Sequence, residues 1–280
     1  MTGGGIEFYK LSGHGNDFIF VDNRAGQVAA ADMPALARAA CRRHFGVGAD
    51  GLIFIVNPPA DVTVDFAWRF FNNDGSEADM CGNASRCAAR YAYLTGLAPA
   101  RLKFLTRAGV IGAEVLPQTV KIELTQPSAP EMDDLLEVDG QNLLFCSINT
   151  GVPHAVTFVP DVAAVEVVKT GRAVRYHPRY QPAGTNVNFV EKKGENLLAV
   201  RTYERGVEDE TLACGTGVTA AVLLSALKGE VTSPTRILPR GGEELLIHFT
   251  RRGDVFTDVF LEGPVRVICH GRLGPDIMRD

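Results

Sequence analysis

The sequence lacks the features that would place it in a membrane or on a nucleic acid. Its longest apolar runs, such as 218–227, are far shorter than the roughly 20 residues that span a bilayer. The start, MTGGGIEFYK, has no basic segment followed by an apolar one, as a secretory signal would have. A net charge of −5 offers a phosphate backbone no attraction. We therefore expect a cytoplasmic protein that binds neither membrane nor nucleic acid.

The six cysteines also lack any spacing that would make them structural. They form no CxxC pair and no Cys/His cluster with zinc-finger spacing, so no metal site is expected. In a reducing cytoplasm they should remain thiols. Four of them are interpreted as small buried apolar residues, namely Cys41, Cys87, Cys146 and Cys269. Cys81 and Cys214 require another explanation.

The chain repeats one order of elements in its two halves. Alternating runs predict strands at 6–11, 18–22, 52–56 and 66–71, a helix over about 32–43, and a helix over 84–95 that ends at Gly96. Arg86 and Arg90 fall one turn apart on what is interpreted as a polar edge of that second helix. More strands follow over 102–124, and then the segment 126–130, with two prolines, interrupts both periodicities. In the second half strands again lead to a helix, over 216–228, which is apolar on every side and must be enclosed.

This order predicts an α/β (α+β) protein of two pseudo-symmetric lobes. Each lobe is expected to be a curved, mostly antiparallel sheet or barrel around a central helix. The N-terminal lobe should span residues 1–127, carry Cys81 and be completed by the C-terminal segment from about 266 to 280. The C-terminal lobe should span 128–265 and carry Cys214.

One glycine-rich stretch matches a nucleotide-binding motif in spacing alone. Residues 46–51, GVGADG, satisfy GxGxxG. That fingerprint needs a strand before it and a helix after it, whereas here a helical stretch precedes and a strand follows. We interpret these glycines as a tight turn that shapes a ligand pocket.

Cys81 and Cys214 each stand before a glycine and a helical run, in the stretches MCGNAS and ACGTGV. A thiol at a helix N-terminus meets the positive end of the helix dipole, which lowers its pKa from about 8.5 toward neutrality. The free N–H groups of the first turn bind a carboxylate. Two such places predict a substrate whose carboxylate is held between opposed helix ends, with the two cysteines facing each other across the gap between the lobes.

Two acid/base thiols and one carboxylate suit the inversion of an amino-acid α-carbon. One group must remove the proton from one face while another delivers a proton to the opposite face. N–H groups aimed at the carboxylate, together with exclusion of water, would stabilise the carbanion-like transition state. No lysine-centred Schiff-base motif stands out, so we predict racemisation without pyridoxal phosphate or any other cofactor.

Motifs along nearly the whole chain resemble those of the diaminopimelate epimerase family. In order they are SGHGNDF at 12–18, HFGVGADG at 44–51, FNNDGSE at 71–77 leading to MCGN at 80–83, PH at 153–154, GTNV at 184–187, ERG at 204–206 and ACGTG at 213–217. The resemblance implies cofactor-free conversion of LL- to meso-diaminopimelate for lysine and peptidoglycan synthesis. It also implies two lobes that close on the substrate, commonly in a homodimer.

The resemblance assigns roles to individual residues. Cys81 and Cys214 would be the acid/base pair and would exchange roles with the direction of the reaction, while His154 and Glu204 would tune the two thiols. The substrate's α-carboxylate would be held by the backbone at Gly82, Asn83, Gly215 and Thr216. Its ammonium and distal groups would be held by Asn16, Asn72, Asn186, Glu204 and Arg205. The planar fork of an arginine suits a carboxylate.

The chain departs from the family pattern in three places. Val152 stands where asparagine is usual, and it cannot make that side chain's hydrogen bonds to the distal end of the substrate. The segment 207–211 is one residue longer than the common form, and Ala84-Ser85 replaces the more usual Gly-Ala.

Three alternatives stay open at this point. Val152 favours a racemase or epimerase of the same fold that acts on another amino acid. Cys214 with His154 as its base would suit a hydrolase or acyl transferase. A non-catalytic amino-acid-binding protein of this fold would show no exchange of the α-proton.

Overall fold

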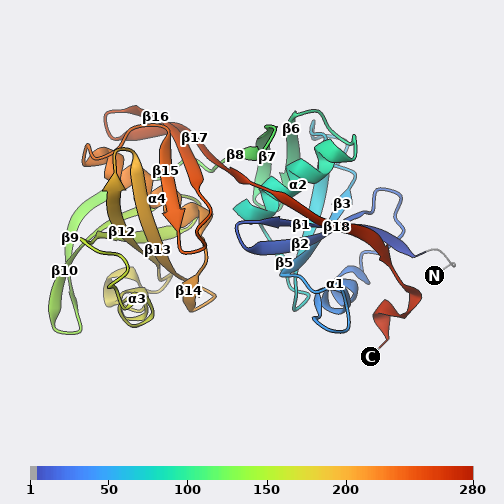
Figure 1. Ribbon diagram of the computed structural model, residues 1–280, viewed down its shortest axis with the longest axis horizontal. Helices are drawn as coiled ribbons and strands as arrows, with labels where there is room; N and C mark the ends of the chain where they lie inside the picture. Colours follow the sequence, from blue (N-terminus) through green and yellow to red (C-terminus); the bar gives the residue numbers. More distant parts are fainter. Residues whose placement is uncertain (1–4, 280) are drawn as a thin grey trace. The chain divides into compact units, whose positions relative to one another are not determined.

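The computed structural model describes residues 5–279 and divides the chain into two compact units (Figure 1). Unit 1 comprises the residues up to Ile122 and those from Gly263 onward, and unit 2 comprises Glu123–Glu262. The chain therefore leaves unit 1 once and returns to it once. The first four residues of the stretch MTGGGIEFYK, in which no signal-like pattern is expected, lie outside the described residues.

Unit 1 is built on a mixed, mostly antiparallel sheet. Its strands pair in the order β18, β1, β2, β3, β4, β6, β7, β8, with β5 added beside β4. Only the pairs β2–β3 and β4–β6 are parallel. The bounds are β1 (Ile6–Gly13), β2 (Asn16–Asp22), β3 (Gly51–Val56), β4 (Phe66–Asn72), β5 (Glu77–Ala78), β6 (Arg101–Thr106), β7 (Gly109–Val115), β8 (Thr119–Glu123) and β18 (Arg266–Leu273).

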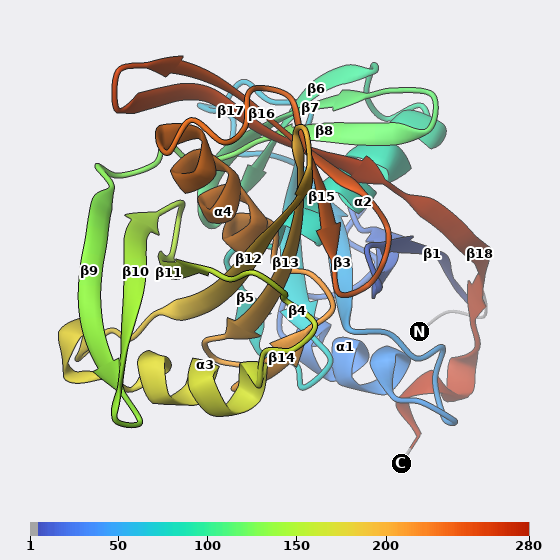
Figure 2. The same ribbon diagram turned by 60° about the vertical axis from the view of Figure 1, so that its left-hand side comes forward.

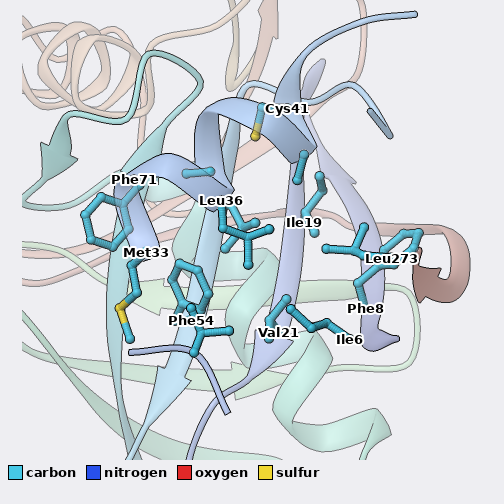
Figure 3. Packing of buried hydrophobic residues seen from close by; sticks show 14 of the residues in the cluster. Ile6, Phe8, Ile19, Val21, Met33, Leu36, Cys41, Phe54, Phe71 and Leu273 are labelled. Atoms are coloured by element: carbon cyan, nitrogen blue, oxygen red, sulfur yellow. The ribbon is translucent and has the colours of Figure 1, made fainter. Parts of the chain in front are cut away.

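Two helices cover the two faces of this sheet, and each connects a parallel pair of strands. Helix α2 (Gly82–Leu94) leads from β5 to β6 and packs on β1, β2 and β7, whereas α1 (Met33–Cys41) leads from β2 to β3 and packs on β3 and β4. The middle of β2, residues 18–21, is apolar and buried on both faces because its alternate side chains meet different helices. Phe20 stacks on Tyr91 of α2 at 5.3 Å between ring centroids, and Ile19 points to the cluster under α1 (Figure 3).

Unit 2 repeats this plan element by element. Its strands pair in the order β9, β10, β11, β12, β13, β15, β16, β17, with β14 beside β13, and only β11–β12 and β13–β15 are parallel. The bounds are β9 (Glu131–Val138), β10 (Gln141–Asn149), β11 (Pro153–Phe158), α3 (Val167–Arg175), β12 (Asn186–Gly194), β13 (Leu197–Glu204), β14 (Asp209–Thr211), α4 (Gly215–Leu227), β15 (Thr235–Pro239), β16 (Leu245–Arg252) and β17 (Val255–Pro264). Among the described residues, short 3-10 helices lie at Pro178–Tyr180 in unit 2 and at Pro275–Met278 in unit 1. Helices α3 and α4 thus occupy the places that α1 and α2 hold in unit 1.

Helix α4 is the central helix of unit 2, as its all-round apolar sequence predicts. Every residue over 217–226 is buried, and the helix contacts β10, β11, β12, β13 and β15, which curve around it (Figure 2). It ends at Gly229, whose φ of 75° suits a glycine at a helix end. The predicted fold class, two pseudo-symmetric lobes of curved sheet around a central helix, is confirmed.

The predicted polar edge of α2 is wrong, because Arg86 and Arg90 are only 0% and 8% exposed. Arg90 donates from Nη2 to the carbonyl oxygens of Leu116 and Thr119, at 2.9 and 3.0 Å. Arg86 donates from Nη2 to Asn83 Oδ1 at 2.7 Å. The sheet encloses the helix on this side too, and backbone and amide oxygens take the guanidinium protons that water would otherwise take.

Within the described residues, no helix is both long enough and apolar enough to cross a membrane.

Candidate active site

Cys81 lies at the start of the central helix of unit 1. It is the N-cap of α2, with extended backbone angles (φ −145°, ψ 128°), and its carbonyl accepts the first helical hydrogen bond from Ser85 N at 2.8 Å. The N–H groups of Gly82 and Asn83, in the first turn, have no acceptor within the helix. The thiol is partly exposed beside these N–H groups. Cys81 therefore stands at a helix end of the kind that suits an anion.

A chain of amide hydrogen bonds runs away from this turn. Asn83 Nδ2 donates to Asn16 Oδ1 at 2.6 Å, and Asn16 Nδ2 donates to Asp50 Oδ2 at 2.9 Å. Arg86 begins the chain through its bond to Asn83 Oδ1. Every donor thus points toward the Asp50 carboxylate, which fixes both carboxamides in one orientation.

Asn72, the last residue of the neighbouring strand β4, lies close to Asp50. It pairs with Gly51 in the β3–β4 ladder, and Asn73 N donates to the carbonyl of Asp50 at 3.0 Å. Sequence reasoning did not single out Asp50 as a site residue, although it lies within the glycine-rich stretch. Its place between two predicted substrate-binding asparagines is decided by strand pairing.

The glycine-rich stretch 46–51 leads from α1 into β3, so the predicted context of a helix before it and a strand after it is confirmed. A Cβ on Gly46 would lie 2.3 Å from the carbonyl oxygen of Ala39, and Gly48 has φ 75°. Glycine is needed here for close packing on α1 and for a left-handed turn.

Cys214 repeats the arrangement in unit 2. It is the buried N-cap of α4 (φ −111°, ψ 109°), and its carbonyl accepts from Val218 N at 2.9 Å. Its Sγ lies 3.5 Å from Thr216 Oγ1, and the Thr216 carbonyl accepts from Thr150 Oγ1 at 3.0 Å. The N–H groups of Gly215 and Thr216 again have no acceptor within the helix.

Asn186 links two more of the predicted residues. It pairs with His154 across the parallel strands β11 and β12, and its Oδ1 accepts from Arg205 N at 2.8 Å while its Nδ2 donates to Pro153 O at 3.0 Å. Arg205 Nη1 donates to Ala183 O at 2.9 Å. Asn186, His154 and Arg205 therefore come together at one end of the sheet.

Burial shifts the pKa values of the two predicted thiol-tuning groups in opposite directions, because it disfavours the charged form of each. It raises the pKa of the Glu204 carboxyl. Burial, with the charge of Arg205 second, lowers the pKa of His154 to about 3. His154 is therefore neutral at physiological pH.

Val152 belongs to a tight turn before β11. Its carbonyl accepts from Thr150 N at 3.2 Å, and Gly151, with φ 113°, donates from its N to Asn149 Oδ1 at 2.9 Å. The valine side chain adds no polar group to this turn.

No group of three or more His, Cys, Asp or Glu within residues 5–279 is arranged to hold a metal ion.

The family model described as diaminopimelate epimerase matches residues 8–129 and 146–268, which include both cysteine sites. The chain belongs to the diaminopimelate epimerase family. It is 49% identical over 282 residues to the diaminopimelate epimerase of Aquifex aeolicus, covering 98% of this chain and 99% of that one. It is 41% identical to that of a Hydrogenobaculum species, covering 96% and 98%. Like its relatives, this diaminopimelate epimerase family member is an isomerase.

Solved structures at low identity share the fold. A phenazine biosynthesis protein of the PhzF family from Bacillus anthracis superposes with a TM-score of 0.73 at 14% identity, covering 96% of this chain and 99% of that one. A hydroxyproline epimerase from Agrobacterium vitis gives a TM-score of 0.68 at 14% identity, with 97% and 93% covered.

The low pKa of His154 predicts a pH-dependent loss of stability. Below about pH 6.5 the unfolded chain binds a proton on this imidazole that the folded chain does not, so the free energy of unfolding falls as pH drops toward 3. In His154→Gln this contribution disappears. In urea unfolding, the free energy of unfolding of the wild type should fall by about 2 kcal/mol more than that of the variant between about pH 7.5 and about pH 5.

His44→Asn, a change at an exposed histidine with φ 71°, is the control. Parallel pH curves for the wild type and His154→Gln would contradict a neutral buried imidazole.

Proposed function

We propose that this chain interconverts LL- and meso-diaminopimelate without a cofactor, in lysine biosynthesis, through the thiols of Cys81 and Cys214. The observation that carries the proposal is the repetition of one site: each unit has a cysteine as the N-cap of its enclosed helix, followed by a first turn whose N–H groups the helix itself cannot satisfy. Membership of the family supports the substrate.

The reaction needs one thiolate and one thiol at a time. The thiolate removes the α-proton, and the electron pair of the C–H bond passes into the carbanion conjugated with the carboxylate. The other thiol delivers its proton to the opposite face, so that each sulfur ends in the state in which the other began. The protein is then ready for the reverse reaction.

The carboxylate must carry the negative charge that develops in the transition state. The backbone N–H groups at Gly82, Asn83, Gly215 and Thr216 are our candidates for holding it, because a helix end needs no reorganisation as charge appears. Asn16, Asn72, Asn186, Glu204 and Arg205 would bind the ammonium and distal groups of the substrate. His154 and Glu204 would set the protonation of the thiols.

Removal of either thiol should abolish inversion. In D2O with LL-diaminopimelate and no added cofactor, the reduced wild type should incorporate α-deuterium and form the meso isomer. Cys81→Ala and Cys214→Ala should each lose about 10²- to 10⁴-fold in turnover, since each removes one acid/base group.

Cys41→Ala is the matched control for these variants. Burial raises the pKa of Cys41 to about 12, so this thiol stays protonated. Full activity of either Cys81→Ala or Cys214→Ala would exclude the two-thiol mechanism.

Val152 supports a second candidate, a racemase or epimerase of the same fold with another amino acid as substrate. An apolar residue in this turn discriminates weakly between distal groups, whereas a hydrogen-bonding one rejects substrates that lack its partner. In a panel of amino acids, the wild type should therefore exchange α-protons on shorter substrates at a measurable rate. Val152→Asn should raise the preference for diaminopimelate about tenfold or more.

Val152→Thr is the control, because it keeps the size and branching of valine and lacks the carboxamide that Val152→Asn introduces. Equal rates on diaminopimelate and an amino acid without a distal amino-acid group, in both variants, would remove any role of this position in selectivity.

We also propose that the chain forms a homodimer and acts in the cytoplasm. Strand β18 exposes Val267 and Ile268, 47% and 51% exposed, and a second copy of the chain is the occupant that we expect on this apolar surface. A two-thiol mechanism needs reduced cysteines, which a reducing compartment maintains.

Ile268→Glu should convert the dimer to a monomer in sedimentation equilibrium, because a carboxylate would be buried without a partner. Val110→Glu, at an equally exposed position on β7, should leave the dimer intact. A monomeric wild type at all accessible concentrations would contradict the proposal.

A further inference from the structure

Beneath the first turn of α4 lies a buried carboxamide that the proposed mechanism does not use. Asn188, on β12, is fully buried. A Cβ on Gly217 of α4 would lie only 2.4 Å from Asn188 Oδ1, so the helix has a glycine where this amide needs space. Glycine is a poorer helix former than alanine. The fold therefore keeps the Asn188 amide in place although the glycine that leaves room for it is unfavourable in a helix.

The orientation of this amide is determined by two groups other than His154. Asn188 Oδ1 accepts from Thr202 Oγ1 at 2.9 Å, and Asn188 Nδ2 donates to the carbonyl oxygen of Ala155 at 3.1 Å. A carbonyl oxygen can only accept, so the NH2 group must face it. The remaining proton of Nδ2 then points to His154 Nδ1, 3.1 Å away.

This contact determines the tautomer of the imidazole. An Nδ1 that accepts a hydrogen bond carries no proton, so the proton of a neutral ring must reside on Nε2. His154 is 1% exposed, and its Nε2 has no hydrogen-bond partner among the residues that the structure describes. A buried donor without a partner is costly unless a ligand or a neighbouring group in a later state uses it.

We propose that Asn188 is a positioning residue that locks His154 as the Nε2–H tautomer, which makes this histidine a hydrogen-bond donor to the reaction centre and not a base. The inference rests on the proposed function for the identity of that centre. A donor of this kind stabilises an anion, such as a thiolate or the developing carbanion with its carboxylate. It also excludes the alternative in which His154 takes the proton of Cys214 to activate a nucleophile, since the one nitrogen able to accept a proton is occupied by Asn188.

The test reads the protonation of the ring directly. Two-bond 1H–15N correlation spectra of 15N-histidine-labelled protein at neutral pH, assigned with His154→Gln, should show His154 with a pyridine-like Nδ1 and a pyrrole-like Nε2. In Asn188→Asp a carboxylate replaces the donor, so the proton should move to Nδ1 or the ring should become imidazolium. A wild-type spectrum with a protonated Nδ1, or an unchanged spectrum in folded Asn188→Asp, would overturn the proposal.

Thr202→Val gives a second route that keeps the buried amide. Loss of the hydroxyl leaves the Ala155 carbonyl as the single group that orients the amide, so the amide can turn part of the time and the second tautomer of His154 should become detectable. Turnover in the deuterium assay should fall about 3- to 10-fold without a matching change in KM, as expected for one neutral hydrogen bond. Thr202→Ser keeps the hydroxyl and should restore both the spectrum and the rate.

The spectra need no substrate, so they separate two kinds of failure. Predicted spectra without any exchange on diaminopimelate would leave the role of Asn188 standing and refute the proposed function. If the wild type exchanges the α-proton of diaminopimelate but its His154 carries the proton on Nδ1, the proposed function would stand and the role of Asn188 would be refuted.

Discussion

The structure depends on one constraint: a helix must be enclosed on all sides while its first turn stays open for an anion. Helices α2 and α4 meet it in the same way, through a curved sheet that contacts the helix body and a cysteine that stands as the N-cap. The enclosed body supplies apolar burial. The open first turn supplies N–H groups that the helix itself cannot satisfy.

The two parallel pairings in each unit are what place the helices. A parallel pair needs a crossover, and in both units one crossover is the central helix and the other is the helix on the opposite face, α1 or α3. Most of the other pairings are antiparallel pairs of consecutive strands, such as β1–β2, β6–β7 and β12–β13, which short turns join. Several of the predicted site residues lie at strand ends or just beyond them: Asn16 begins β2, Asn72 ends β4, and Arg205 follows β13.

A network of polar side chains lies beside the first turn of each enclosed helix. In unit 1 the chain from Arg86 through Asn83 and Asn16 ends on the carboxylate of Asp50, with every donor pointing the same way. In unit 2 the network around Asn188 ends on a neutral imidazole. The two sites share their helix geometry but differ in the side chains around it, and this difference is compatible with the proposal that the two thiols hold opposite protonation states.

Much of this protein follows from the sequence alone. The all-round apolar run of α4, the glycines after Cys81 and Cys214, and the repeated order of elements were enough to predict two lobes with enclosed helices, because periodicity and helix-start signals are local. What only the tertiary structure decided are the partners. Arg86 and Arg90 show a polar edge in sequence yet lie buried, Asp50 reaches Asn16 across 34 residues, and Asn188 orients His154 from a strand 34 residues further along. Strand pairing and enclosure bring these residues together, and no local pattern encodes which oxygen will meet which proton.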